Sequence, residues 1–233
     1  SWPTADGTEN QVLKTDGSGT LSWTTSSSGA SNVNGLSDAL IEDNSLYLGQ
    51  DPSSTTSTAE YNLSIGVTAL DAITTGDANI AIGHDALSAN TTGSGNLAIG
   101  YGAYDNADTE GNNLAIGRDA LGGSINGGET NIAIGNYSLD ANTSGDRNVA
   151  LGYVALTQNS TGTYNVAIGS GASQLNSSGS SNTSLGNNSM YSNTSANYNT
   201  AIGAEALYDI ARTSDTDGYN TALGYNAGNT GTN

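Results

Sequence analysis

The chain repeats one five-residue pattern of polar and apolar positions at nearly constant spacing. The pattern reads Asn, an aliphatic residue or Thr, Ala or Ser, Ile or Leu, and then Gly. Its ten copies lie 17 residues apart, except for one interval of 18 and one of 21. They begin at Asn62, Asn79, Asn96, Asn113, Asn131, Asn148, Asn165, Asn182, Asn199 and Asn220, and a degenerate copy occupies residues 45–49. Such a period predicts a repeat architecture in which each unit stacks on the next.

The alternation within each copy predicts a short β-strand. Ile80 and Ile82 lie two residues apart and therefore share one strand face, whereas Ala81 points the other way. We interpret the aliphatic face as the core and the Ala row as the outer face. The repeat residues on which this interpretation rests are Asn79, Ile82, Gly83, Asn96, Ile99, Gly100, Asn131, Ile134, Gly135, Asn165, Ile168 and Gly169.

The rest of each unit predicts turns. The Gly after the strand indicates positive φ or close backbone contact. A second small residue and usually a Leu follow, and a polar corner such as residues 90–93 closes the coil. A 17-residue unit is too short for two helices and fits two short strands with two turns. The sequence therefore predicts an all-β fold, a parallel β-solenoid (β-roll) of about ten 17-residue coils over residues 45–233.

Composition narrows the possible functions. Glycine supplies 32 of 233 residues and only 11% are charged, which also suits disorder, but the strict period favours a repeat fold. The net charge of −18, with four basic residues, argues against nucleic-acid binding. No apolar run in the sequence is long enough to predict a membrane span. The absence of cysteine excludes disulfides and thiolate metal sites.

One chain alone has few large apolar residues with which to offset its loss of conformational entropy. Each coil holds about three, each contributing roughly 1.5–3 kcal/mol when buried, against about 1.5 kcal/mol for each ordered residue. We therefore expect self-association, with the Ala row or the second small-residue row packed against identical chains around a cyclic axis.

The repeat units beginning at Asn79, Asn131 and Asn165 resemble the head repeats of YadA-like trimeric adhesins. The resemblance covers residues 45–233, although the period of 17 is longer than the usual unit of that family. It implies a left-handed parallel β-roll of three identical chains, hence a homotrimer, and a role in surface attachment.

The first 28 residues form a different segment. Residues 11–15 and 20–23 alternate around Asp16-Gly17-Ser18-Gly19, which predicts a β-hairpin. This segment resembles one common in bacteriophage tail-fibre and other virion-fibre proteins, which implies an attachment segment that binds other virion or surface-assembly proteins. Residues 29–44 are predicted to be a connector. YadA-like repeats in phage fibres often precede a self-cleaving chaperone domain, so we expect the full protein to continue past residue 233 or to be cleaved there.

These features predict a structural or adhesive fibre protein without catalytic activity or cofactor. The expected location is a virion, as a bacteriophage tail fibre or spike that attaches to the host surface. The alternative is the head of a bacterial trimeric autotransporter-like adhesin at the cell surface. An ice-binding solenoid would need a flat Thr array, whereas Thr is scattered here, and no thermal hysteresis is expected.

Most residues that could form a functional site also fit ordinary surface or turn positions. His84, the one histidine, follows a repeat Gly at a variable position and is expected to face solvent. The acids Asp85, Glu110, Asp119, Glu129 and Glu205 are expected at solvated corners, and residues 215–218 as a turn insertion rather than a calcium loop. Asn90, Asn142, Asn159, Asn176 and Asn193 lie in glycosylation-type triplets, interpreted as turns. Tyrosines beside the repeat motif are candidate contacts for a host cell-surface glycan, or cover a neighbouring coil: Tyr61, Tyr101, Tyr153, Tyr164, Tyr198, Tyr219 and Tyr225.

Overall fold

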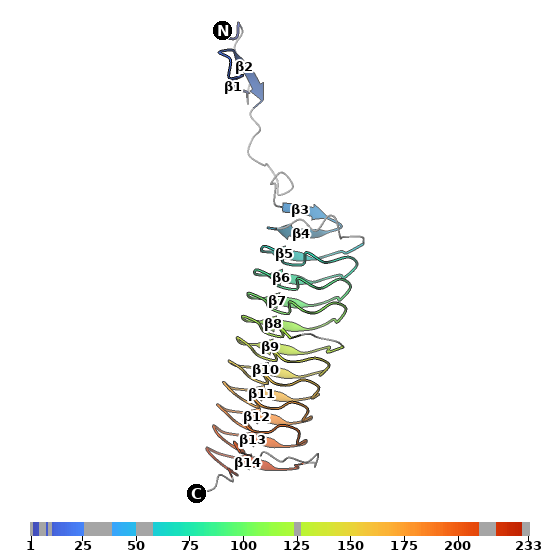
Figure 1. The fold of residues 1–233 in the computed structure, drawn as a ribbon, viewed down its shortest axis with the longest axis vertical. Helices are drawn as coiled ribbons and strands as arrows, with labels where there is room; N and C mark the ends of the chain where they lie inside the picture. The colour runs from blue at the N-terminus through green and yellow to red at the C-terminus, as the bar shows by residue number, and fades with distance from the viewer. Residues whose placement is uncertain are drawn as a thin grey trace.

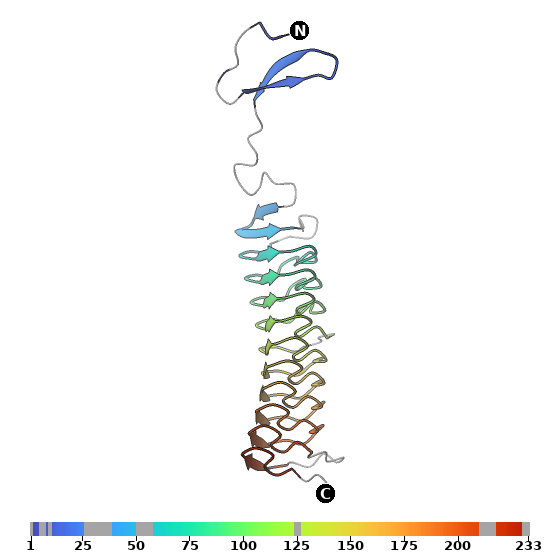
Figure 2. The same cartoon turned by 90° about the vertical axis from the view of Figure 1, so that its left-hand side faces the viewer.

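The structure is a computed structural model that describes residues 2–4, 8, 11–25, 39–49, 58–123, 127–209 and 218–229. All regular secondary structure in these residues is β-strand. The predicted fold class is confirmed: coils of about 17 residues stack into a parallel β-solenoid, which follows a small antiparallel hairpin in the sequence (Figures 1 and 2).

The N-terminal hairpin pairs β1 (Gln11–Thr15) with β2 (Leu21–Thr25). Its turn is held by the Asp16 carboxylate, which accepts hydrogen bonds from the backbone N–H groups of Ser18 (2.8 Å) and Thr20 (3.0 Å). Leu13 pairs with Trp23 across the two strands. Within the described residues, β1 and β2 contact only each other. A two-stranded ribbon alone is marginally stable in water.

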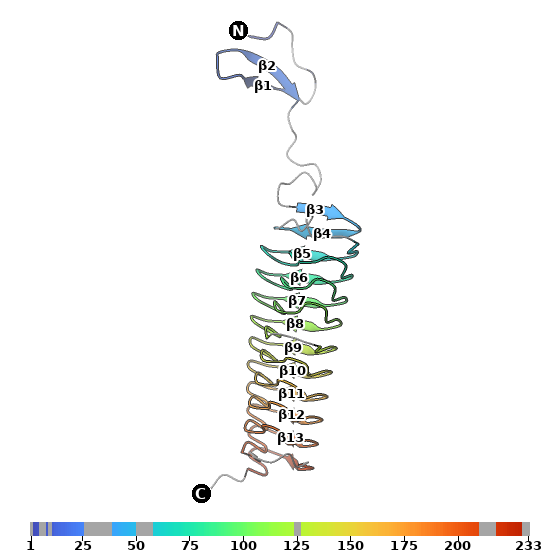
Figure 3. The ribbon, with the colours of Figure 1, turned by 45° about the vertical axis from the view of Figure 1, so that its right-hand side comes forward.

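The solenoid sheet contains twelve strands in sequence order. β3 (Ala39–Glu42) and β4 (Ser45–Leu48) are antiparallel, and the strands that follow are all parallel. The parallel strands are β5 (Leu63–Ile65), β6 (Ile80–Ile82), β7 (Leu97–Ile99), β8 (Leu114–Ile116), β9 (Ile132–Ile134), β10 (Val149–Leu151), β11 (Val166–Ile168), β12 (Thr183–Leu185), β13 (Thr200–Ile202) and β14 (Thr221–Leu223). Equivalent repeat positions pair in register, as Ala81 does with Ala98. Figure 3 shows the strands stacked in this order.

The predicted connector contains a strand that covers the N-terminal end of the sheet. β3 turns into β4 through Asp43 and Asn44, both with left-handed backbone angles (φ 44° and 60°). Because β3 runs antiparallel, the first strand of the sheet does not offer the parallel edge on which another coil of the repeat would stack. Tyr47 of β4 is fully buried and pairs with Ser64, so an aromatic ring closes this end of the small-residue row. β4 also confirms that the degenerate copy at residues 45–49 belongs to the repeat.

The predicted orientation of each strand is wrong: the Ala row faces the core and the aliphatic residues face outward. Ala81, Ala98 and Ala115 are completely buried, whereas Ile65 and Leu151 are 39% and 41% exposed. The second small-residue row is buried as well, so neither Ala row is available to another chain. A 17-residue coil is too narrow to hold two large side chains from its strand in addition to the opposite wall. That wall supplies one buried Leu from most coils: Leu70, Leu87, Leu121, Leu139, Leu156 and Leu207.

Each complete coil has one strand rather than the predicted two. The wall opposite the strand places left-handed residues at alternate positions, as at Asp85 (φ 59°) and Leu87 (φ 53°), and these interrupt an extended conformation. Hydrogen bonds still join the coils there, because Leu87 N–H donates to the Ala103 carbonyl (3.1 Å).

The repeat Asn side chains form a buried ladder that joins every coil to the next. The Asn148 carboxamide oxygen accepts from the Asn165 backbone N–H (3.0 Å), and its Nδ2 donates to the Gly162 carbonyl (2.8 Å). The same bonds recur along the row, for example from Asn96 N–H to Asn79 Oδ1 (2.9 Å). Asn therefore recurs because each side chain satisfies backbone groups of two coils that water cannot reach.

We expect Asn148→Ala to lower the free energy of unfolding by about 2–4 kcal/mol, because it leaves a buried N–H and a buried carbonyl without this partner. The matched control is Asn187→Ala, whose exposed side chain makes one bond to the Ser170 carbonyl (3.1 Å). It should change stability by less than about 0.5 kcal/mol. Urea denaturation followed by circular dichroism measures both, and equal losses would contradict the ladder's role.

Candidate functional site

The outward face of the parallel strands is the largest feature that the sequence interpretation missed. Its two central columns are the residues one and three after the repeat Asn, here named the aliphatic stripe. Only Thr183, Thr200 and Thr221 among them are polar. The apolar members are Leu63, Ile65, Ile80, Ile82, Leu97, Ile99, Leu114, Ile116, Ile132, Ile134, Val149, Leu151, Val166, Ile168, Leu185, Ile202 and Leu223.

The aliphatic stripe runs along the whole stack of parallel strands. Its side chains are partly exposed in every strand from β5 to β14, and Leu185 and Leu223 reach 43% and 76% exposure. At about 4.8 Å per strand, ten strands make this apolar band roughly 45 Å long. Soluble monomers rarely expose continuous apolar patches of more than a few hundred Å², and larger ones mark binding surfaces.

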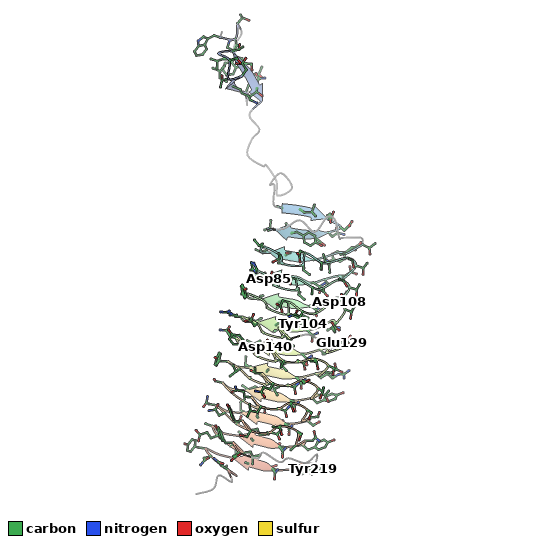
Figure 4. The ribbon with its side chains drawn as sticks, viewed as in Figure 1. Asp85, Tyr104, Asp108, Glu129, Asp140 and Tyr219 are labelled. Atoms are coloured by element: carbon green, nitrogen blue, oxygen red, sulfur yellow. The ribbon has the colours of Figure 1, made fainter. Side chains whose placement is uncertain are left out.

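Two further columns lie beside the stripe, one at each end of the parallel strands. The upstream column holds the residue before each repeat Asn: Tyr61, Ala78, Gly95, Asn112, Thr130, Arg147, Tyr164, Ser181, Tyr198 and Tyr219. The downstream column holds the residue after each repeat Gly: Val67, His84, Tyr101, Arg118, Asn136, Tyr153, Ser170, Asn187, Ala204 and Tyr225. All seven candidate tyrosines lie in these columns and are 50–75% exposed, with Tyr219 visible at the solenoid edge in Figure 4.

Several of these tyrosines stack on side chains of neighbouring coils. Tyr101 lies between His84, whose ring is parallel at 5.3 Å, and the Arg118 guanidinium at 5.4 Å. Arg147 covers Tyr164 (5.4 Å), and Tyr198 stacks on Tyr219 (5.2 Å). A sugar ring stacks on an open aromatic face, so these contacts leave fewer such faces than the sequence suggested. Tyr61 and Tyr225 have no ring contact within the described residues.

Among the five candidate acids, Glu110 is misplaced by the sequence interpretation, because it is buried (6% exposed) rather than solvated. It replaces the Gly found at this position in other coils, and its carboxylate accepts from the backbone N–H groups of Thr109 (3.1 Å) and Gly127 (2.9 Å). The other four, Asp85, Asp119, Glu129 and Glu205, keep partly or fully exposed side chains.

Two other residues near Glu110 depart from the repeat pattern. Tyr104 replaces the core Leu, and its hydroxyl lies 2.5 Å from Asn113 Nδ2. Ala107 replaces the corner Asn found in the coil before, so Asn90 Oδ1 lacks the Asn donor that Asn142 Oδ1 has in Asn159 (3.1 Å).

His84 is half-exposed, as expected, and its Nδ1 lies 2.6 Å from the Asp85 carboxylate. The five triplet Asn side chains are buried and donate to carbonyls three residues ahead, as Asn142 does to Gly145 (3.0 Å). They therefore sit at turns. Residues 215–217 of the calcium-like fragment lie outside the described residues.

The described residues contain no group of three or more His, Cys, Asp or Glu side chains that could hold a metal ion. No helix among them is long and apolar enough to span a bilayer.

A row of aspartates borders the solenoid beside the downstream column (Figure 4 labels Asp85 and Asp140). Partial burial raises the pKa of Asp71, Asp105 and Asp140 above the ordinary value, and neighbouring carboxylates add to the effect. Asp119 acts on both Asp105 and Asp140 in this way. The row therefore carries mutual repulsion at neutral pH.

This arrangement predicts a solenoid that becomes more stable on mild acidification. A folded-state pKa above the unfolded value means that the folded chain binds more protons, so this contribution to stability grows as pH falls through the raised pKa values and is lost as pH rises. We expect the melting temperature to rise as the pH falls from neutral through the raised pKa values of these three carboxyl groups, which lie above the ordinary aspartate value of 3.8. Asp105→Asn should be more stable than the parent at pH 7 and gain less on acidification. A parent whose melting temperature falls on mild acidification would contradict this interpretation.

In comparison with known proteins, no family model, no curated protein and no solved structure matches this chain.

Proposed function

We propose that this chain is a structural and adhesive fibre protein, a bacteriophage tail fibre or virion spike, and that it acts as a homotrimer. One observation supports it above all others: a rod with an aliphatic stripe along its outward strand face. A rod of stacked coils gives length and stiffness, and the described residues contain no metal-ligand cluster that would suggest another use of the surface.

Identical chains are the partner that fits the aliphatic stripe best. A second copy offers an apolar band of the same length and the same strand spacing, so all ten strands can contribute at once. The composition of the face also suits a protein interface, with aliphatic residues at the centre and Tyr and Arg on both sides. An anionic membrane surface fits poorly, because the chain has a net charge of −18 and only four basic residues.

The number three comes from the resemblance to trimeric adhesin heads. A closed ring of three copies about an axis parallel to the rod would bury the stripe of every chain and leave no open copy of the interface. The N-terminal hairpin then supplies three attachment segments at one end, each with Leu13 and Trp23 paired across its strands. The flank tyrosines that remain outside the trimer contact are the proposed glycan contacts at a host surface.

Mass spectrometry of purified particles and of cell-surface fractions from the same culture tests the location. We expect peptides of this chain in the particles, at copy numbers divisible by three. Recovery only from cell surfaces, joined to a downstream membrane anchor, would favour the bacterial adhesin instead.

A further inference from the structure

One polar corner of the solenoid is built differently from the ordinary ones. At an ordinary corner, two consecutive backbone N–H groups donate to one carbonyl of the next coil, as Thr143 (2.9 Å) and Ser144 (3.0 Å) donate to Ser160. One coil further on, Ser160 (2.8 Å) and Thr161 (3.1 Å) donate in the same way to Ser177. Backbone groups therefore fasten each of these corners to the next corner along the rod.

The coil that contains β7 departs from this pattern at residues 107–110, here named the β7 corner. The N–H groups of Asp108 (3.2 Å) and Thr109 (3.1 Å) occupy the equivalent positions, but they donate to the carboxylate of Glu110 in their own coil (Figure 4 labels Asp108). The other oxygen of this carboxylate accepts from the Gly127 N–H of the next coil (2.9 Å). One side chain therefore binds three backbone N–H groups from two coils.

The replacement of one Asn makes room for Glu110. The matching position in other coils is Gly, and at Gly162 a Cβ would lie 2.4 Å from the corner Asn159 Oδ1. In the β7 corner that Asn is replaced by Ala107, so no carboxamide of the same coil obstructs Glu110. The replacement also affects the coil before, where Asn90 Oδ1 is buried and has no hydrogen-bond partner among the described residues.

The charge of Glu110 makes it dependent on this corner. The residue is 6% exposed, and neither ion pair of the described residues, His84–Asp85 or Arg118–Asp119, involves it. A buried carboxylate without a neighbouring cation needs hydrogen-bond donors that replace the water it has lost. The three N–H groups are these donors, so the carboxylate and the corner stabilise each other.

We propose that Glu110 is a clasp that holds the β7 corner to the rod, and that this corner opens more easily than the ordinary corners. Stacked repeats are held by contacts between neighbours, so local opening begins where such a contact is weakest. The β7 corner lacks the Asn–Asn bond to the coil before it. Within the described residues, its hydrogen bond to the next coil passes through the Glu110 side chain alone.

Hydrogen exchange of the native protein, followed by mass spectrometry, measures this opening in the parent chain. After correction for intrinsic rates, the amides of Asp108 and Thr109 should exchange at least about 10-fold faster than those of Thr143 and Ser144, because local opening that needs fewer broken bonds is more frequent. Equal protection at the two corners would contradict the proposal.

Glu110→Gln tests the clasp itself. The variant keeps the size of the side chain but replaces one carboxylate oxygen with an NH2 group, which cannot accept from these N–H groups. Exchange at Asp108, Thr109 and Gly127 should rise about 10- to 100-fold, as expected when hydrogen bonds to a charged group are lost. The matched control is Glu129→Gln, which makes the same change at an exposed side chain of the next coil and should leave these amides unchanged.

The amides of Thr143 and Ser144 are the reference in every variant. Faster exchange that is confined to the β7 corner and Gly127 in Glu110→Gln supports the clasp. The proposal fails if exchange in Glu110→Gln is unchanged, if it rises equally at the reference amides, or if Glu129→Gln has the same effect. If Glu110→Gln does not fold, the comparison of the two corners within the parent chain decides.

Discussion

Ile99→Asp combined with Ile168→Asp will convert the proposed trimer into folded monomers. Both side chains lie in the aliphatic stripe, on β7 and β11, and both are partly exposed in the single chain. Both side chains are already mostly buried in the single chain, so association buries only the remainder and their loss removes about 1–2 kcal/mol of apolar burial per chain. The larger cost comes from the two carboxylates per chain that association would bury without partners. We expect association to weaken on the order of 10³-fold or more, while each chain keeps its solenoid.

The matched control places the same charges on another side of the same rod. Thr92→Asp combined with Thr161→Asp changes two exposed corner residues that lie outside the stripe and its flanks. This variant carries the same added charge and should keep the oligomeric mass of the parent in light scattering. Equal dissociation of both variants would mean that net charge, not the stripe, controls association.

Gly152→Ala will be among the most destabilising single substitutions in the chain. Gly152 has φ 143°, and a Cβ there would lie 2.5 Å from the carbonyl oxygen of Gly169 in the next coil. The substitution therefore forces apart two coils in the middle of the stack, where each coil is held by its neighbours. We expect a loss of more than about 3 kcal/mol in the free energy of unfolding, with the rod opening at this coil.

Gly224 distinguishes the cost of the steric clash between coils from the cost of a left-handed backbone angle at a residue with a side chain. It occupies the same repeat position with a similar φ of 119°, but nothing lies within 4 Å of its would-be Cβ, because no described coil follows. Gly224→Ala should lose only the backbone contribution, about 1–3 kcal/mol. Denaturant midpoints measure both variants, and a Gly152→Ala variant no less stable than Gly224→Ala would contradict close stacking at the Gly row.

The repeat period was enough to predict most of the architecture. The 17-residue spacing predicted stacked coils in register, and the spacing of Asp16 to Gly19 predicted the hairpin turn. β3 was missed because Ala39, Leu40 and Ile41 form a short apolar run that belongs to no repeat unit. One strand per coil was missed because left-handed angles at residues such as Leu87 have no signature in a single sequence.

The sequence interpretation placed the aliphatic residues of each strand inside and the Ala residues outside, and the structure has the reverse. Alternation shows that Ala81 and Ile82 point to opposite sides, but it does not show which side is interior. The preference for burying large aliphatic residues favoured the wrong side. A better signal was available: Asn79 and Ala81 share a face and recur almost without change, whereas the stripe positions vary among Ile, Leu, Val and Thr. A narrow interior tolerates less variation than a surface that packs against another chain.

The oligomeric mass of the purified chain in dilute, neutral buffer tests the central claim most directly. Native mass spectrometry should give three times the chain mass of 23.3 kDa, and the assembly should persist at concentrations well below micromolar. A single-chain mass with intact β-sheet circular dichroism would show that the aliphatic stripe stands open to water, and the account of this protein as a self-associating fibre would fail.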